Sequence, residues 1–464
     1  MIRKQTEYTY KFLARIVIEA ETPIAVGSGK KEILTDAPVV KDFNGLPYIP
    51  ASALAGTMRH VCREYSDDIV LDRLFGFHEN KQSEGSLMYF TDALLIGEDG
   101  LTVEGIVKVD NSEFYNSYRN LPIRNRVSIT HRGVGKSGAK FDNEVVYAGS
   151  RFCFEIEMSA RSESDYQYFD VILDSINNKS FRLGGNTRNG LGMVKTVSCK
   201  TARFNLSDCN DLQEYLNKSS SLSKPLSSVF IERNNNQSKN IDDKWLDYEL
   251  KIKPYDFFFF GSGFGDALNV ADMVPVREDI IIWNTDIYPK PKKVSKCILI
   301  PASSIKGAIS HRVAYYYNLL NGRFAGEETE AKICADNEAV RALFGYYDSD
   351  TLEVKRGNVI FSDVVIEPED NLHSEKLFNH VSIDYFTGGA IDGALFTDKV
   401  DMYNKYFKLN ISVRKSAFDN ENVKKSFEMA LQDICEGLLP LGGSVNRGYG
   451  CFTGFVTLNN ETNE

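Results

Sequence analysis

The chain has 464 residues, of which 42% are hydrophobic and 25% charged, proportions typical of folded globular domains. Its net charge of −10 argues against a strongly basic, free-standing nucleic-acid binder but leaves room for one locally basic groove. No segment approaches the roughly 20 apolar residues of a membrane span, and we find no signal peptide. The eight cysteines lack metal-ligand spacing, so we expect reduced thiols in a cytoplasmic protein.

In chain order, residues 13–19 alternate as a strand, and a glycine-containing loop follows from Val26. A helix is expected from the Pro-Ala-Ser segment at residue 50 to about residue 65. A short apolar strand, a long loop and an alternating strand at 151–158 come next. A second helix at about 163–177 then leads, through a glycine-rich segment, to a final strand.

The second half of the chain repeats this plan with recognisable sequence echoes. The copies lie about 250–270 residues apart and follow the same order, which is too long a period for a solenoid and fits two fused domains. The echoes are LPYIPASALAGTMRH with ILIPASSIKGAISHR, LFGF with LFGY, GSLMYFTDA with GNVIFSDVV, RVSI with HVSI, and LGGNTRNGLG with LGGSVNRGYG.

The element order strand–helix–strand–strand–helix–strand predicts an α+β fold of two tandem ferredoxin-like modules, a plan shared with RNA-recognition domains. We expect a first domain at residues 1–200 and a second at 244–464. Residues 201–243 are rich in Ser, Asn and Lys, which is typical of an inter-domain linker.

Two segments of each half could bind an anion. The glycine-rich segments would expose backbone amides to a phosphate, with an arginine inside each loop, although a tight connection would also need glycine. The Pro-Ala-Ser helix starts would add free amides, serine hydroxyls and nearby cations, although a plain helix cap explains the same pattern. The candidates are Gly184, Gly185, Arg188, Gly442, Gly443 and Arg447 in the loops, and Ser52, Arg59, Ser303, Ser304, Lys306 and Arg312 in the helices.

Asp36 lies in the loop before the first Pro-Ala-Ser segment, and Asp272 occupies the comparable place in the second half. A loop aspartate beside an RNA phosphate can bind Mg²⁺ or help to activate a nucleophile, although aspartate before Ala-Pro is also a common turn former. The segments that begin at Arg126 and His380 each have a glycine-rich tip between apolar flanks, which predicts projecting hairpins. Arg132, Lys136 and Lys140 make the first one basic, as an ordinary solvated hairpin could also be. Arg126, Arg132 and Lys136 are its candidate RNA-binding residues.

The run D-A-P-V-x-x-D-x-x-G-x-P-Y-I-P-A-S-A-L-A-G-x-x-R from Asp36 to Arg59 resembles the repeat-associated mysterious protein (RAMP) superfamily, and most of all the backbone subunits of type III CRISPR effector complexes. The resemblance continues through the other echoes in both halves and implies two such subunits fused, as in type III-D variants. It implies a palm that grips guide-RNA phosphates, a thumb hairpin that wedges into the guide–target duplex, and a loop aspartate that cuts target RNA with Mg²⁺ or Mn²⁺.

Asp36 matches the implied catalytic and metal-binding position residue for residue. Asp272 is the corresponding candidate, but its spacing to proline is one residue longer and an insertion at about 280–294 follows, which leaves Asp266 as a competitor. Ala55 stands where the family often has a lysine, as at Lys306.

The resemblance therefore implies an RNA-guided endoribonuclease that works with guide RNA, complementary target RNA and other effector subunits, away from membranes. A non-catalytic guide-binding subunit is the first alternative. A stand-alone nuclease that processes precursor guide RNA is the second, although such an enzyme usually needs a well-placed histidine and none stands out.

Overall fold

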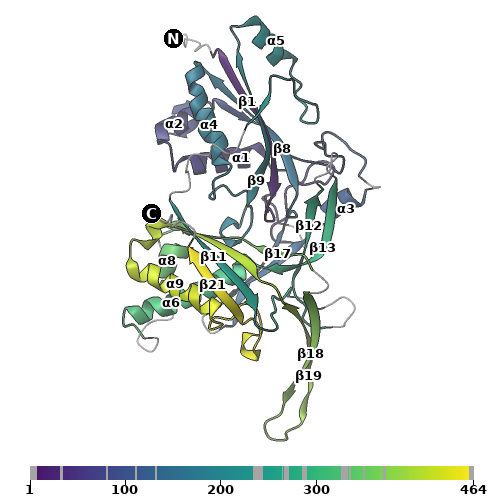
Figure 1. The fold of residues 1–464 in the computed structure, drawn as a ribbon, viewed down its shortest axis with the longest axis vertical. Coiled ribbons are helices and arrows are strands. Elements are labelled where there is room, and N and C mark those ends of the chain that lie inside the picture. Colours follow the sequence, from purple (N-terminus) through teal and green to yellow (C-terminus); the bar gives the residue numbers. More distant parts are fainter. Residues whose placement is uncertain are drawn as a thin grey trace.

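The computed structural model describes residues 8–31, 35–79, 82–109, 112–130, 133–233, 244–263, 265, 271–284, 290–324, 333, 336–348, 351–368 and 372–458. It is a mixed α/β protein whose sheets are antiparallel. The two halves of the chain lie one above the other, and a long hairpin projects from the second half (Figure 1).

The main sheet of the first half has six strands: β1 (Tyr10–Ala20), β4 (Met88–Phe90), β5 (Leu94–Leu95), β8 (Arg151–Ala160), β9 (Val194–Asn205) and β10 (Ile231–Glu232). Their order is β10-β9-β1-β8-β4, with β5 also paired to β8. Alternate residues of β1, including Phe12, Ile16 and Ile18, are fully buried because one face of the sheet packs against helices. Those helices are α1 (Ala51–Cys62) and α4 (Tyr166–Ser175).

The second half has a four-stranded sheet in the order β16-β20-β11-β21, formed by β11 (Trp245–Pro254), β16 (Val359–Phe361), β20 (Phe407–Arg414) and β21 (Phe452–Leu458). Its covering helices, α6 (Ala302–Leu320) and α9 (Glu421–Cys435), pack against each other. Leu250, Ile411 and Phe427 form part of a separate buried core. Phe407, Leu409, Ile411 and Val413 of β20 are all buried, so this strand alternates as its counterpart β8 was predicted to do.

Smaller elements connect these layers. In the first half they are α2 (Asp68–Phe75), β2 (Phe77–Glu79), β3 (Gln82–Glu84), α3 (Glu113–Arg119), β6 (Ile123–Ile129), β7 (Gly135–Glu144) and α5 (Cys209–Asn217). In the second half they are β12 (Arg277–Trp283), β13 (Pro291–Ile300), α8 (Glu338–Phe344), β14 (Gly345–Tyr347), β15 (Val354–Arg356), β17 (Val364–Ile366), β18 (His373–Ile383) and β19 (Ala390–Tyr403). No helix among the described residues is long and apolar enough to cross a bilayer.

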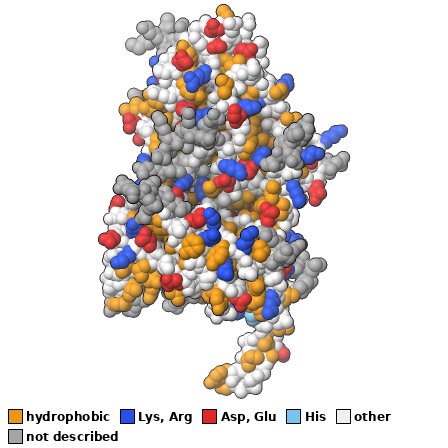
Figure 2. Space-filling model, in the orientation of Figure 1, with side chains coloured by type: hydrophobic (Ala, Val, Ile, Leu, Met, Phe, Trp, Pro, Cys, Tyr) orange, Lys and Arg blue, Asp and Glu red, His pale blue; other side chains and the backbone are white. Residues whose placement is uncertain are grey.

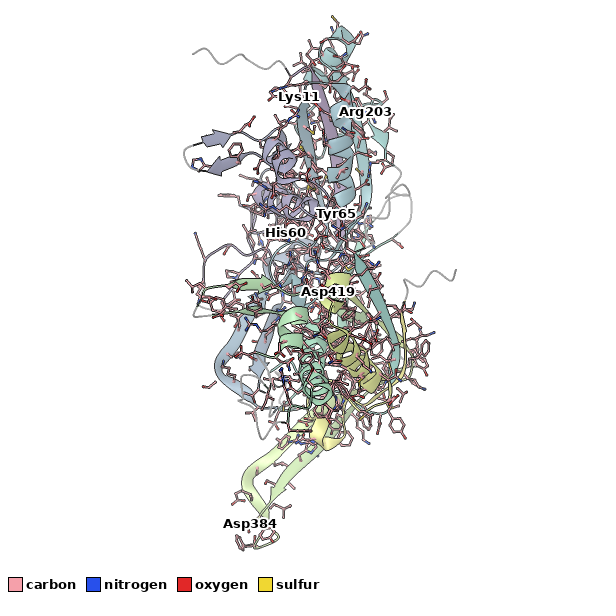
Figure 3. The ribbon with its side chains drawn as sticks, turned by 90° about the vertical axis from the view of Figure 1, so that its left-hand side faces the viewer. Lys11, His60, Tyr65, Arg203, Asp384 and Asp419 are labelled. Carbon is pink, nitrogen blue, oxygen red and sulfur yellow. The ribbon has the colours of Figure 1, made fainter. Side chains whose placement is uncertain are left out.

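The two segments predicted as hairpins are the antiparallel pairs β6–β7 and β18–β19. The second ribbon extends well away from the body of the molecule, and Asp384 lies near its far end (Figure 3). The tip aromatics Tyr385 and Phe386 are 93% and 91% exposed. Apolar side chains are also visible along this ribbon in the space-filling view (Figure 2).

The insertion in the second half forms the hairpin β12–β13, which packs on the first half. Ile280 makes a parallel bridge to Ala148, and the indole Nε1 of Trp283 donates to the carbonyl of Gly149 at 2.7 Å. Ile281 and Trp283 are buried within the core of the first half. This insertion therefore joins the two halves through a shared core.

Part of the segment predicted as a linker folds onto the first sheet. Residues 201–205 complete β9, and β10 pairs with β9 along its outer edge. The guanidinium group of Arg15 donates to the carbonyls of Ser221, Leu222 and Lys224. Backbone carbonyls make these contacts, so the polar composition of the segment gave no sign of them. Residues 234–243 lie outside the described residues.

Candidate functional site

Asp36 is held against the inner end of the β6–β7 hairpin. Its amide donates to Oδ1 of Asp142 at 2.7 Å, and the amide of Asp142 donates to Oδ2 of Asp36 at 3.3 Å. The next residue, Ala37, forms a parallel bridge with Asn143. The Asp36 side chain is half-buried, so the reciprocal contact fixes the carboxylate while leaving part of it accessible.

Asp272 has the same relation to the β18–β19 hairpin. Its amide donates to the carbonyl of Thr397 at 2.9 Å, and the amide of Thr397 donates to Oδ2 of Asp272 at 2.7 Å. Met273 forms a parallel bridge with Asp398, as Ala37 does with Asn143. The two aspartates are therefore equivalent in backbone register.

The longer Asp-to-proline spacing in the second half does not displace the aspartate. Gly27 pairs with Val39 in the first half, and Gly261 pairs with Pro275 in the second. The proline has thus moved to the position of Val39, and the carboxylate has kept its place. Asp266, the competing candidate, lies outside the described residues.

The two candidate sites differ in the residue beside the aspartate. Asp142 brings a second carboxylate to Asp36, whereas Thr397 stands beside Asp272 and donates its hydroxyl to Oδ1 of Asn379 at 2.9 Å. Mg²⁺ keeps several waters and is commonly held by one or two carboxylates together with substrate phosphates. Both settings fit such a loosely held ion, and the first offers it more carboxylate oxygens.

The starts of α1 and α6 are capped differently from the sequence prediction. Serine caps were expected, but Pro50 and Pro301 occupy the N-cap positions and no side chain of either makes a cap. Instead, the amide of Ala51 donates to Asp92 at 2.7 Å, and the amide of Ala302 donates to Asp363 at 2.8 Å. The signal was present in the repeated motifs YFTD and IFSD.

The serines and arginines of these helices have separate roles. Ser52 and Ser304 are exposed and Ser303 is half-buried. Arg59 pairs with Asp72 and donates to the carbonyl of Gly76, whereas Arg312 pairs with Asp433 at 2.9 Å and donates to the carbonyl of Leu438. These contacts hold the helices to their own halves, and RNA binding by Arg59 and Arg312 stays a prediction.

The glycine-rich loops need glycine for backbone reasons. Gly184 has φ of +83°, and a Cβ there would lie 2.5 Å from the carbonyl oxygen of Ala25; the equivalent Gly442 would meet that of Phe259 at 2.3 Å. The next amides, of Gly185 and Gly443, donate to these same two carbonyls. The amides of Gly185 and Gly443 are therefore already hydrogen-bonded within the protein.

The loop arginines are also engaged. The Nε of Arg188 donates to the carbonyl of Gly357 at 3.0 Å, so this side chain reaches across to the second half. Arg447 pairs with Asp398 at 3.1 Å and lies over the ring of Phe396. Arg447 is thus tied to the base of the β18–β19 ribbon, whereas Arg188 belongs to the contact between halves.

Five cations gather where the two halves meet, and we call them the interface cation cluster: Arg126, Arg182, Arg188, Lys306 and Arg356. Burial lowers the pKa of all five, and neighbouring cations lower it further. Lys306, whose pKa falls to about 8, is affected first by burial and then by Arg188 and Arg126.

Hydrogen-bond acceptors do not saturate this cluster. Nη1 of Arg126, Nη1 of Arg188, and both Nε and Nη1 of Arg182 are buried without a hydrogen-bond partner. Nearby acids are already paired, Asp363 with Arg124 and Glu64 with Arg414. Buried guanidinium nitrogens normally have partners, so an anion would complete this arrangement.

The cluster also joins predicted elements that lie far apart in the sequence. Lys306, from the start of α6, donates to Asn189 in the glycine-rich loop of the first half at 3.0 Å. Arg356 donates to Thr187 of that loop and contacts His60 of α1. His60, which lies near the middle of the molecule, has a pKa lowered by burial and by Arg356 (Figure 3). Lys136 is exposed on β7, outside the cluster, and Arg132 lies outside the described residues.

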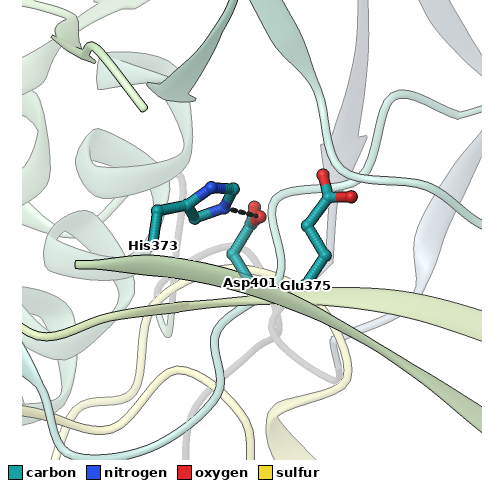
Figure 4. Close-up of side chains that lie close together, drawn as sticks. All are labelled: His373, Glu375 and Asp401. Carbon is teal, nitrogen blue, oxygen red and sulfur yellow. Dashed lines mark hydrogen bonds and ion pairs between the residues drawn. The ribbon is translucent and has the colours of Figure 1, made fainter. Parts of the chain in front are cut away.

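One group of three potential metal ligands lies elsewhere among the described residues: His373, Glu375 and Asp401 (Figure 4). His373 contacts Asp401 at 2.8 Å, and Arg277 pairs with both carboxylates. Burial raises the pKa of Asp401, but hydrogen bonds from His373 and Arg277 outweigh it and lower the pKa. Arg277 already supplies the positive charge that a metal ion would bring to these carboxylates. We therefore interpret the group as a set of ion pairs that holds the β18–β19 ribbon to β12.

Comparisons with known proteins agree with this duplicated arrangement. The sequence model of the RAMP superfamily matches residues 17–195 and 259–453, one region in each half and together well over half of the chain. The CRISPR system Cms endoribonuclease Csm3 of Methanocaldococcus jannaschii is 27% identical over 207 residues, which cover 40% of this chain and 78% of that protein. The chain belongs to the RAMP superfamily.

Proposed function

We propose that this protein is the guide-RNA-binding backbone subunit of a type III CRISPR effector complex and that it cleaves complementary target RNA. The interface cation cluster is the observation that carries the proposal, because Arg188, Lys306 and Arg356 remain at least partly accessible and phosphate groups would neutralise the charge that these cations concentrate. The name of the similar Csm3 protein supports the same class of complex and activity.

Each half would be one ferredoxin-like module. The main strands of the first half lie in the order β9-β1-β8-β4, and those of the second in the order β21-β11-β20-β16. When the four main strands of each half are numbered in chain order, both sheets have the spatial order fourth, first, third, second. This shared order supports the assignment of one ferredoxin-like module to each half.

Asp36 and Asp272 would be the catalytic aspartates. A bound Mg²⁺ or Mn²⁺ would stabilise negative charge on the phosphate that is being cleaved. The contribution of the chain would be positional: the amide of Asp142 or Thr397 fixes one oxygen of each aspartate, which sets the direction of the other. The attacking group would be the 2′-hydroxyl of the target RNA, as the resemblance implies.

A guide-binding measurement tests the cluster. Lys306→Gln should weaken binding of the purified chain to guide RNA regardless of guide sequence, and should reduce the salt slope of log K by about one. Lys425→Gln, on α9, is the control and should leave both quantities unchanged. Unaltered affinity and salt slope in Lys306→Gln would contradict a phosphate at this position.

The second candidate is a subunit that holds RNA without cutting it. The contacts of Asp36 and Asp272 with strand amides favour this alternative, since such a contact would also be kept for structural reasons. The cleavage experiment that closes the Discussion separates the two candidates.

A further inference from the structure

The outer edge of the first sheet is covered by a strand from later in the same chain. Strand β10 pairs with β9, the amide of Arg233 donates to the carbonyl of Cys199 at 2.7 Å, and the Glu232 carboxylate accepts from the amide of Cys199 at 2.9 Å. The guanidinium group of Arg233 then pairs with Asp170 and Asp174 of α4, at 2.9 and 2.7 Å. An extended segment with an arginine thus closes both the edge and the groove beside the helix.

The second half has the same edge without such a cover. Val456 lies opposite Leu250 in β11, as Cys199 lies opposite Ile16 in β1. Among the described strands, none pairs with the outer edge of β21. The unpaired amides and carbonyls of an edge strand are a template for another strand.

An open groove accompanies this edge, at the place that Arg233 fills in the first half. Its volume is about 380 Å³, and it is lined by Tyr248, Lys425, Glu428, Met429, Gln432, Val456 and Leu458. Phe169 of α4 and Phe427 of α9 are both fully buried against their sheets, so we treat them as equivalent positions. Counted from these two residues, Asp170 corresponds to Glu428 and Asp174 corresponds to Gln432. Glu428 is therefore the carboxylate that corresponds to a partner of Arg233.

We propose that the β21 edge and this groove bind an extended segment of a different protein chain, whose arginine pairs with Glu428. The segment would add a strand beside Val456, Thr457 and Leu458, with backbone hydrogen bonds supplying affinity and the groove selecting the cation. Tyr248 donates to one oxygen of Glu428 at 2.9 Å and holds the carboxylate in place.

Lys424 of the same helix lies 3.9 Å from Glu428, but both side chains are more than two-fifths exposed, so this pair is weak and leaves the carboxylate available to a second cation. Residues 459–464, which follow β21, contain no lysine or arginine and include two glutamates, so they do not match Glu428. The segment around Arg233 is already engaged in the first half. A partner chain with a basic extended segment fits the groove better than either.

A peptide with the sequence SSVFIERNNN, residues 227–236 of this chain, is a suitable probe because its native contacts define the binding mode. Fluorescence anisotropy should show saturable binding of the labelled peptide to the full-length protein. Glu428→Lys should weaken it about fivefold or more, since attraction becomes repulsion. A peptide with Glu in place of Arg should bind poorly to the wild type and regain affinity for Glu428→Lys. Glu421→Lys, which makes the same charge change on α9 outside the groove, should have no effect.

Three outcomes would overturn the proposal. The first is an absence of saturable binding. The second is loss of binding in Asp170→Lys but not in Glu428→Lys, which would mean that the peptide displaces β10 in the first half. The third is self-association of the wild type that Glu428→Lys abolishes in sedimentation, which would make a second copy the occupant.

Discussion

At the scale of single residues, the buried cations between the halves destabilise the folded protein, and a bound anion would offset that destabilisation. Arg182 is only 5% exposed, and two of its guanidinium nitrogens lack partners. Isolated buried charge is unfavourable, and each added cation makes its neighbours harder to protonate. We therefore interpret the cluster as prepared for phosphate, and expect bound RNA to stabilise the contact between the halves.

This arrangement predicts that RNA binding depends on pH through Lys306. In the free protein Lys306 loses its proton as pH rises through about 8, whereas a nearby phosphate favours the charged form and raises its pKa. Binding then takes up a proton above pH 8, so affinity should fall as pH increases, by up to roughly tenfold between pH 8 and 9. Titrations of guide RNA at several pH values measure this.

Lys306→Arg provides the control, because the ordinary pKa of arginine lies well above that of lysine and the same surroundings leave more of it charged over this range. It should bind RNA with a flatter pH profile, while ionisation of the RNA bases affects both proteins alike. Identical pH profiles for the two proteins would show that Lys306 does not face the RNA.

At the scale of elements, each Pro-Ala-Ser helix is fixed to its sheet by an aspartate cap, but the two caps differ in setting. Asp92 is exposed, whereas Asp363 is buried and also pairs with the buried Arg124. Arg124 pairs in addition with Glu278 of β12 at 3.0 Å. The second cap is therefore also part of the junction between halves.

The two caps should respond differently to removal. Asp92→Ala should lower the free energy of unfolding by about 1 kcal/mol, which is typical of a lost cap. Asp363→Ala should cost more, about 3–5 kcal/mol, because it leaves part of the charge of Arg124 uncompensated. Urea unfolding measures both, and equal losses in the two variants would contradict the proposed role of Asp363 at the junction.

The β18–β19 ribbon carries aromatic side chains to its tip, where nothing in the described chain covers them. Tyr385→Ser combined with Phe386→Ser should leave stability nearly unchanged, since both side chains are more than 90% exposed. If the ribbon acts as a wedge, the variant should lose about 1–3 kcal/mol for each stacked base and change the reactivity of a target nucleotide towards single-strand probes. An unchanged probing pattern would identify an ordinary solvated hairpin.

At the scale of the whole molecule, the β12–β13 insertion makes the two halves one folded unit. Trp283→Ala should cost about 3–5 kcal/mol, as is usual for a buried tryptophan. It should also separate the unfolding of the two halves, which calorimetry would record as two transitions in place of one. A single transition at lower temperature would mean that the remaining contacts between the halves, including the ion pairs of Arg124, are enough to couple them.

Much of this organisation could be predicted from the sequence, because the repeats preserve both motifs and alternation. The duplication, the order of the main elements, both hairpins and the place of Asp36 follow from such patterns. The roles of Arg59 and Arg312 could not be predicted, since their partners Asp72 and Asp433 are set by helix packing. The cation cluster could not be predicted from the sequence either, because its members come from both halves and meet only in the folded structure.

The equivalence of Asp36 and Asp272 is the central claim, and the most direct test is the product ladder of the assembled complex on labelled complementary RNA with Mg²⁺. Asp36→Ala and Asp272→Ala should each remove a different band, by on the order of 10²–10⁴ in rate, while RNA binding is kept. The two bands should lie one module's footprint apart, and the double variant should lose both. Loss of neither band in the double variant would contradict catalysis by these aspartates, and loss of the second band only in Asp266→Ala would transfer the role in the second half to that residue.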